Sequence, residues 1–214
     1  MSRASAELPR LYAIVDVEVA GRAGWTPRDL TDAYLSGGAR LLQLRAKTLP
    51  GAALLELANE LAALARTAGA QLIVNDRADI AVLAGAAGVH VGQDDLTPRD
   101  VRSIAGDECV VGLSTHTDQQ VEEAIASPIS YFAIGPVFAT GTKATGYDGV
   151  GLATVARAAA RGRGAGLPVA AIGGITLATA PAVIAAGAAT VAVITDLLTE
   201  DPEARVRDYL GALG

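Results

Sequence analysis

Cysteine is almost absent from this sequence, since Cys109 is the one cysteine among 214 residues. An intrachain disulfide is therefore excluded, and no Cys/His cluster is available for a structural zinc ion. Long apolar runs are also lacking, because none approaches the roughly 20 residues that a membrane-spanning helix needs. The opening segment MSRASAELPR has no apolar block of the kind found in signal peptides. These absences predict a cytoplasmic protein with no membrane partner.

Positive charge is limited, with 17 basic against 23 acidic side chains and a net charge of −6. We expect no nucleic-acid partner, because nucleic-acid-binding surfaces carry a basic stripe that neutralises phosphates. Lysine is scarcer still: Lys47 and Lys143 are the two lysines, and the remaining basic residues are arginines. A mobile ammonium differs chemically from a planar guanidinium. The two lysines become candidate binding residues if the fold brings both into one site.

Apolar residues, by contrast, make up 51% of the chain, enough for a substantial core. They gather in short runs that alternate with Ala/Leu-rich segments of helical period. The runs are LYAIVDV (11–17), ARLLQLRA (39–46), QLIVN (71–75), GVHVG (88–92), VVGLS (110–114), YFAIGPV (131–137), PVAAIGG (168–174) and TVAVIT (190–195). Helices are predicted over 27–38, 51–69, 97–106, 117–127, 151–162 and 176–188.

Eight strand-and-helix units predict an α/β protein with a (β/α)8 TIM-barrel fold. We expect a single domain over residues 1–214, with 1–10 as an N-terminal extension. The alternative is an open doubly wound sheet, but VDVEVAGRAG follows the first strand where that fold would place a G-x-G-x-x-G motif. In a TIM barrel the active site lies at the C-terminal ends of the strands, so polar residues that close different strands become neighbours.

The second run carries polar residues at every other position. Gln43, Arg45 and Lys47 are spaced by two and point to the same face, whereas Leu42 and Leu44 face the opposite way. The spacing predicts a polar column inside the barrel. A buried salt bridge that fills the barrel floor is the alternative interpretation.

Carboxamides and carboxylates close the third and fourth runs. Asn75 and Asp76 end the first of these, and Gln93, Asp94 and Asp95 follow the second. Neighbouring strands lie about 4.8 Å apart, so Asp76 and Asp95 are predicted to hold one hard cation together. Helix capping is the alternative for such residues, and we expect it to apply to either Asp94 or Asp95.

The two histidines receive different interpretations. Ser114 ends the fifth run, and His116 behind it is either a proton shuttle or a hydrogen-bonded loop histidine. His90, inside GVHVG, is interpreted as a structural core histidine.

Two glycine-containing segments are candidate anion sites. Thr140, Thr142 and Lys143 lie in the Gly-rich segment 138–151, which suits an anion cradle, with a flexible surface loop as the alternative. IGGIT (172–176), placed before a predicted helix, and VITD (193–196) lie where many barrels bind phosphate. A simple glycine turn is the alternative there. The mouth would then offer two separate anion sites, one of them with a metal.

The ordered set of segments resembles the thiamine phosphate synthase family nearly from end to end. The matching segments are LYAIVD, QLRAK, VNDRADIA, GVHVGQDD, GLSTHT, GPVFATGTK, AIGGI and VAVITD. The resemblance implies a (β/α)8 barrel that joins hydroxymethylpyrimidine pyrophosphate to thiazole phosphate, with Mg²⁺ as cofactor, giving thiamine phosphate and pyrophosphate. It implies small-molecule substrates as partners. The sequence leaves the oligomeric state open, and a homo-oligomer is compatible with it.

The resemblance also implies roles for individual residues. Those that match the pyrimidine pyrophosphate site are Gln43, Arg45, Lys47, Asn75, Ser114 and Lys143; the magnesium ligands are Asp76 and Asp95; the thiazole phosphate contacts are Thr140, Thr142, Gly174, Ile194 and Thr195. Arg45, Lys47, Ser114 and Lys143 are the expected catalytic residues. Thr195 stands where the family often has Ser, and the segment ATGYDGVG after Lys143 is less typical. The alternatives are a thiazole tautomerase of a sister family, with His116 as its proton shuttle, and a non-catalytic phosphate-binding barrel.

Overall fold

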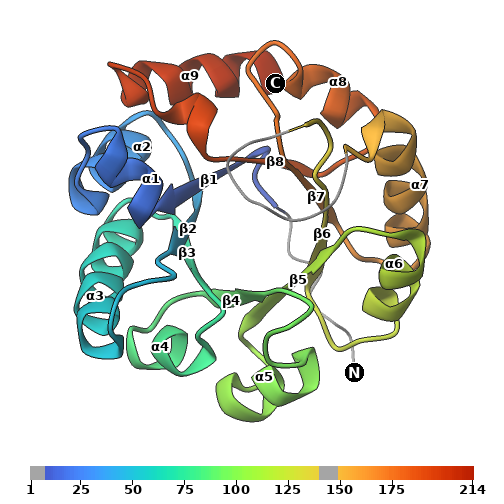
Figure 1. Cartoon of the computed structure of the whole chain (residues 1–214), viewed down its shortest axis with the longest axis horizontal. Coiled ribbons are helices and arrows are strands. Elements are labelled where there is room, and N and C mark those ends of the chain that lie inside the picture. The colour runs from blue at the N-terminus through green and yellow to red at the C-terminus, as the bar shows by residue number, and fades with distance from the viewer. Residues whose placement is uncertain (1–7, 140–148) are drawn as a thin grey trace.

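Eight parallel strands close into a barrel in sequence order, and β8 returns to pair with β1 (Figure 1). The computed structural model describes residues 8–139 and 149–214. The strands are β1 (Leu11–Asp16), β2 (Leu41–Arg45), β3 (Gln71–Asn75), β4 (Gly88–Val91), β5 (Val110–Thr115), β6 (Tyr131–Ile134), β7 (Val169–Ile172) and β8 (Thr190–Val193). The predicted (β/α)8 barrel is confirmed, and the open doubly wound sheet is wrong.

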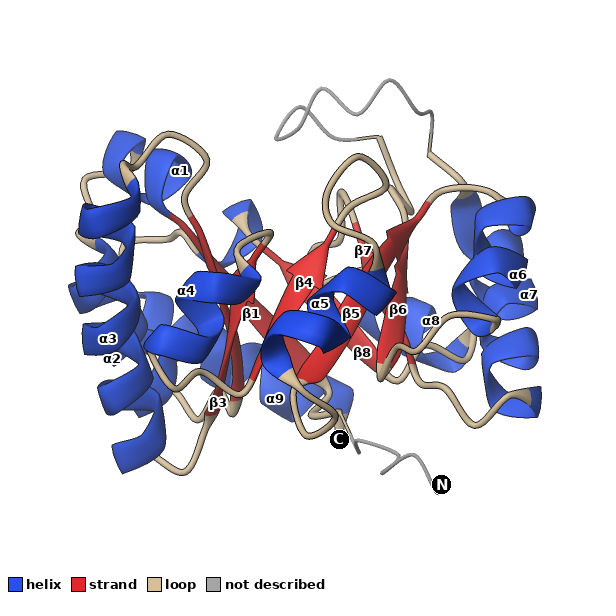
Figure 2. Ribbon diagram, turned by 90° about the horizontal axis from the view of Figure 1, so that it is seen from below, coloured by secondary structure: helices blue, strands red, loops and turns tan. Residues whose placement is uncertain are grey.

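The helices surround the barrel as an outer layer (Figures 1 and 2). Within the described residues they are α1 (Val17–Arg22), α2 (Pro27–Ser36), α3 (Gly51–Thr67), α4 (Ala78–Leu83), α5 (Pro98–Ala105), α6 (Asp118–Ile125), α7 (Gly151–Gly164), α8 (Ala180–Ala185), the 3-10 turn η1 (Thr195–Leu197) and α9 (Pro202–Leu213). The sequence did not predict α1, α4 or α9. Val17 had been assigned to the first strand, but the carboxylate of Asp16 accepts the N–H of Val19 at 3.0 Å and so begins α1 directly.

Alternating side chains of the strands divide the apolar residues into two regions. Leu42 and Leu44 belong to the large core between barrel and helices. Leu41 and Ile73 belong instead to a small cluster inside the barrel, together with Tyr12 and Tyr131. Inward and outward residues therefore alternate along the strands as the spacing of β2 predicted.

The N-terminal segment enters the barrel before β1 begins. Leu8 is buried in the small interior cluster, and the carbonyl of Arg10 accepts the N–H of Val191 at 2.9 Å. Of the predicted extension 1–10, residues 8–10 thus contact the barrel, and 1–7 lie outside the described residues. Among the described helices, none combines the length and apolar character that crossing a membrane requires.

Candidate active site

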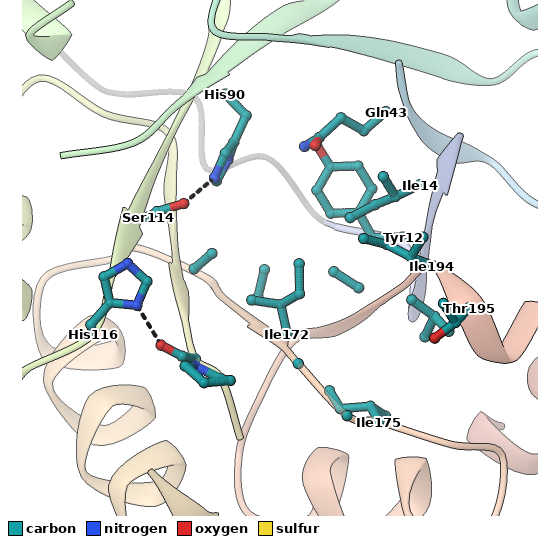
Figure 3. Close-up of a pocket in the computed structure, with 18 residues that line it drawn as sticks. Tyr12, Ile14, Gln43, His90, Ser114, His116, Ile172, Ile175, Ile194 and Thr195 are labelled. Atoms are coloured by element: carbon teal, nitrogen blue, oxygen red, sulfur yellow. Dashed lines mark hydrogen bonds between the residues drawn. The ribbon is translucent and has the colours of Figure 1, made fainter. Parts of the chain in front are cut away.

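A pocket with an open volume of about 830 Å³ occupies the end of the barrel where the strands finish (Figure 3). Its lower walls come from the strands themselves, and its upper walls come from the segments that follow β6, β7 and β8. Ala133, Ala170 and Ala192, one from each of these strands, line it. Because alanine leaves inward space that larger residues would fill, the composition of β6 to β8 keeps this side of the barrel open.

Hydrogen bonds link five strands across the floor of the pocket. The distances are 2.7 Å from Gln43 Nε2 to Tyr12 Oη, 3.1 Å from Tyr12 Oη to Tyr131 Oη, 2.9 Å from Tyr131 Oη to His90 Nδ1 and 2.8 Å from His90 Nε2 to Ser114 Oγ. Figure 3 shows the last of these as a dashed line. The interpretation of His90 as a buried, hydrogen-bonded histidine is confirmed. Sequence reasoning missed that His90 also lines the pocket and that two tyrosines connect it to Gln43.

Each cation on β2 contacts a carboxylate from a neighbouring strand. Arg45 forms an ion pair with Asp16, whose side chain is only 1% exposed. Lys47, beyond the end of β2, forms an ion pair with Asp76 at the surface of the mouth. Gln43 is buried and lines the pocket, so the predicted polar column inside the barrel is confirmed at Gln43. Arg45 and Lys47 lie at and beyond the end of β2, and the ion pair of Arg45 joins the last residues of β1 and β2, so it is not the salt bridge at the barrel floor that was the alternative.

Asp76 and Asp95 approach each other from the ends of β3 and β4. Burial raises the pKa of Asp76, and Asp95 raises it further, while Lys47 acts in the opposite direction. Burial alone would also raise the pKa of Asp95, but the N–H of Gly92, the contact with Asp76 and the charge of Lys47 together lower it. Asp76 is the one described non-glycine residue with a positive φ, at 64°. The pair is a site of concentrated negative charge held on a strained backbone.

The donor set at this pair suits Mg²⁺. Among residues 8–139 and 149–214 no group of three or more His, Cys, Asp or Glu side chains could hold a metal. Mg²⁺ commonly uses one or two protein carboxylates and takes its other ligands from water and substrate phosphates. Asp76 and Asp95 fit that pattern, and the ammonium of Lys47 already lies against one of the two carboxylates.

The helix caps expected from these strand ends are wrong. The residue that precedes α5 is Thr97, whose hydroxyl accepts the N–H of Asp100 at 3.2 Å, so neither Asp94 nor Asp95 caps that helix. Asp95 instead accepts the N–H of Gly92 at 2.8 Å, which stabilises the turn after β4. Helix α4 likewise begins without a side-chain cap. Neither Asp94 nor Asp95 is therefore committed to a helix cap.

Glycine backbone and isoleucine side chains line the opposite side of the mouth. Gly173 and Gly174 have φ values of 100° and 64°, and a Cβ on Gly174 would lie 2.7 Å from the carbonyl oxygen of Ala139. The expectation that IGGIT leads directly into a helix is wrong, because α8 begins only at Ala180. The glycine backbone therefore lines the pocket from a loop and not from a helix N-terminus.

Ile194 and Thr195 follow β8 and also line the pocket, with Thr195 as the first residue of η1. The carboxylate of Asp196 anchors this segment to neighbouring elements. It accepts hydrogen bonds from Arg205 Nη2 at 2.7 Å, Tyr209 Oη at 2.6 Å and the N–H of Leu177 at 2.9 Å. The turn is thereby tied to α9 and to the loop after β7.

His116 is held by its surroundings. Its Nδ1 lies 2.6 Å from the carbonyl oxygen of Gly135, which is the dashed line at His116 in Figure 3. Its backbone N–H donates to Gln120 Oε1 at 2.7 Å. The hydrogen-bonded loop histidine is confirmed. Because His116 lines the pocket as well, a proton-shuttle role stays a prediction.

The predicted site residues fall into three groups. Gln43, Ser114, Gly174, Ile194 and Thr195 line the pocket. Arg45, Lys47, Asn75, Asp76 and Asp95 are at or just beyond the ends of β2, β3 and β4. Thr140, Thr142 and Lys143 lie outside the described residues.

Fold and site together define the class: a TIM-barrel enzyme whose mouth suits anionic small molecules. A family model described as thiamine monophosphate synthase matches residues 11–197. The chain belongs to the thiamine monophosphate synthase family.

Individual relatives agree over nearly the whole length. The chain is 43% identical over 209 residues to the thiamine-phosphate synthase of Koribacter versatilis (strain Ellin345), which covers 97% of each chain. It is 42% identical over 198 residues to that of Roseiflexus sp. (strain RS-1), covering 92% of this chain and 82% of the relative. The solved thiamine phosphate pyrophosphorylase from Pyrococcus furiosus superimposes with a TM-score of 0.85 at 27% identity, covering 95% of each chain. The activity of this family is that of a transferase, and the tautomerase alternative is not favoured.

Proposed function

We propose that this protein joins hydroxymethylpyrimidine pyrophosphate to thiazole phosphate, forming thiamine phosphate and releasing pyrophosphate. The observation that carries the proposal is the meeting of Arg45, Lys47 and the Asp76/Asp95 pair at one rim of a barrel of this family. A leaving pyrophosphate develops negative charge, and fixed cations beside it stabilise that charge.

The two cations of β2 would bind the pyrophosphate. Arg45 is held in place by buried Asp16, so its guanidinium is preorganised. Lys47 is about half exposed and contacts Asp76. On substrate binding it would exchange this carboxylate for a phosphate oxygen. Lys143, known from the sequence alone, would add a third cation.

Asp76 and Asp95 would hold Mg²⁺. The ion, when bound, supplies positive charge to the phosphate oxygens. Oxygen ligands from two carboxylates and a pyrophosphate are those that it prefers.

The floor and the far side of the pocket would orient the reacting groups. Gln43, Asn75 and Ser114 would hold the pyrimidine part, whose ring can delocalise the cation that develops as pyrophosphate departs. Gly174, Ile194 and Thr195 would hold the thiazole phosphate, with Thr140 and Thr142 as further contacts. The main contribution of this side is position, because a correctly oriented thiazole nitrogen meets the methylene carbon without a competing encounter with water.

The direct test is incubation with both substrates and Mg²⁺, with pyrophosphate and thiamine phosphate measured together. Equal amounts of the two products support the proposal. Pyrophosphate release without thiamine phosphate, or neither product, contradicts it. A cytoplasmic location and assembly into a homo-oligomer stay predictions.

A further inference from the structure

One direction of the hydrogen-bond chain across the pocket floor gives every buried hydrogen in it an acceptor. It begins at the Gln43 Nε2 group, which can only donate, so the oxygen of Tyr12 accepts and the Tyr12 hydrogen is left for Tyr131. In that direction Tyr131 donates its own hydrogen to Nδ1 of His90, which lies 2.9 Å from Tyr131 Oη. A neutral imidazole that accepts at Nδ1 carries its hydrogen on Nε2. His90 therefore donates to Ser114 Oγ.

Both phenols keep the hydrogens that this direction needs. Tyr131 is fully buried and Tyr12 is 2% exposed. Burial raises the pKa of each tyrosine above its usual value, so neither ionises near neutral pH.

Gly112 on β5 has no side chain, and this allows the chain of hydrogen bonds to run without a break. Gly112 lies between His90 on β4 and Tyr131 on β6, paired in register with each. A Cβ at position 112 would lie 2.2 Å from Tyr131 Cζ and 2.4 Å from His90 Nδ1. The two side chains can therefore meet across β5 only because residue 112 is glycine. The glycine at position 112 is an observation independent of the hydrogen bonds, and it also indicates that His90 and Tyr131 are meant to be in contact.

We propose that Tyr12, Tyr131 and His90 are positioning residues that preset the polarity of the two substrate-binding groups at the ends of the chain. At one end Ser114 accepts from His90 and so has its hydroxyl hydrogen available to donate into the pocket. At the other end Gln43 is oriented by its Nε2 contact, which leaves its amide oxygen available as an acceptor. A heterocycle that offers both a ring-nitrogen acceptor and an amino donor matches this polarity. The inference rests on the proposed function for its substrate, an aminopyrimidine.

The hydrogen-bond direction can be measured without activity. The sequence has two histidines, so a protein labelled with ¹⁵N-histidine gives two ring systems, and the spectrum of His116→Gln assigns them. We expect His90 in the free wild-type protein to be neutral, with its hydrogen on Nε2. In Tyr131→Phe the donor to Nδ1 is gone, and the Nδ1 resonance should move. A hydrogen on Nδ1 in the wild type would overturn the proposal.

Kinetics test the positioning role with a matched control. Tyr131→Phe should lower kcat/KM for the pyrimidine pyrophosphate about 10-fold, the effect of one lost hydrogen bond to a polar group, and leave KM for thiazole phosphate unchanged. Tyr34→Phe removes an equally buried hydroxyl that has no hydrogen-bond partner among the described residues and lies on α2 away from the pocket. It should leave both parameters unchanged.

Equal effects of Tyr131→Phe and Tyr34→Phe, or equal losses for both substrates, would contradict the positioning role. If Tyr131→Phe does not fold, Tyr12→Phe removes the acceptor of Gln43 instead and is subject to the same kinetic criteria. If the wild type forms no thiamine phosphate, the proposed function fails, whereas the tautomer measurement still decides the direction of the chain.

Discussion

Charge is distributed unequally around the mouth of the barrel. On the side of β1 to β4, Asp16, Arg45, Lys47, Asp76 and Asp95 form a group of adjacent charges. On the side of β6 to β8, the described residues that line the pocket are uncharged and are mainly alanine, glycine and isoleucine, and the carboxylate of Asp196 after β8 is paired with Arg205. The difference matches two tasks. A leaving pyrophosphate gains charge during the reaction and needs opposing charges, whereas a phosphate that stays intact needs only to be held.

Removing the metal ligands is the strongest test of the charged side. Asp76→Ala and Asp95→Ala should each lower activity about 100-fold or more, because positive charge beside the leaving group is lost. Chelation should abolish activity in the wild type, and added Mg²⁺ should restore it. The measurement is pyrophosphate release in steady state.

Asp94→Ala is the control for these two variants, since Asp94 is the neighbouring carboxylate that was not chosen as a ligand. It should change activity far less. Equal losses at Asp94 and Asp95 would show that the wrong ligand was chosen, and full activity in excess chelator would remove the metal from the proposal.

Asp16→Asn tests whether Arg45 needs a charged partner that fixes its guanidinium in order to bind the pyrophosphate. Asparagine is as good an N-cap as aspartate, so α1 should persist, while the charged partner of Arg45 disappears. We expect kcat/KM for the pyrimidine pyrophosphate to fall about 10-fold. Asp79→Asn makes the same change in the exposed pair with Arg77 and should have no measurable effect. Similar results for the two variants would mean that Asp16 contributes nothing specific.

Gly174→Ala addresses the uncharged side. A side chain there meets the carbonyl of Ala139 and requires a left-handed backbone, which disfavours alanine by roughly 1–2 kcal/mol. KM for thiazole phosphate should rise several-fold, with little change for the pyrimidine substrate. Gly164→Ala, on α7 with open space around it, is the control for a glycine substitution as such. An effect confined to the pyrimidine substrate would contradict the assignment of the two sides.

Ionic strength should have the smallest effect of these tests, and it should change the two KM values to different extents. Salt screens interactions between charges that water can reach. Raising it from about 0.05 M to about 0.5 M should increase KM for the pyrimidine pyrophosphate about two- to fourfold and KM for thiazole phosphate less. Each KM is measured with the other substrate saturating. A larger increase in KM for thiazole phosphate than for the pyrimidine pyrophosphate would place the stronger charge–charge contact on the side of β6 to β8.

The barrel could be predicted from the sequence because its eight apolar runs are separate and alternate with segments of helical period. Sequence reasoning missed α1, where the β-branched Val17 and Val19 favour a strand, but Asp16 caps a helix. The inward position of Gln43 could be predicted because a strand has a period of two, whereas Lys47 lies beyond the end of β2. The link between His90 and Tyr131 could not, because it depends on closure of the barrel and on the space left by Gly112 between two strands that do not pair with each other. The predictions for Thr140, Thr142 and Lys143 fall outside the described residues.

The positive φ of Asp76 limits which amino acids position 76 can accept. Glutamate would keep the charge, but a longer side chain rarely adopts the left-handed region. Asparagine and glycine adopt that region readily, but they carry no charge. Aspartate alone among the twenty amino acids satisfies both requirements, whereas Asp95, whose backbone has no such constraint, could exchange for glutamate with a smaller penalty. In a library of variants the two positions should therefore differ sharply in tolerance, although both carboxylates are proposed to bind the same ion.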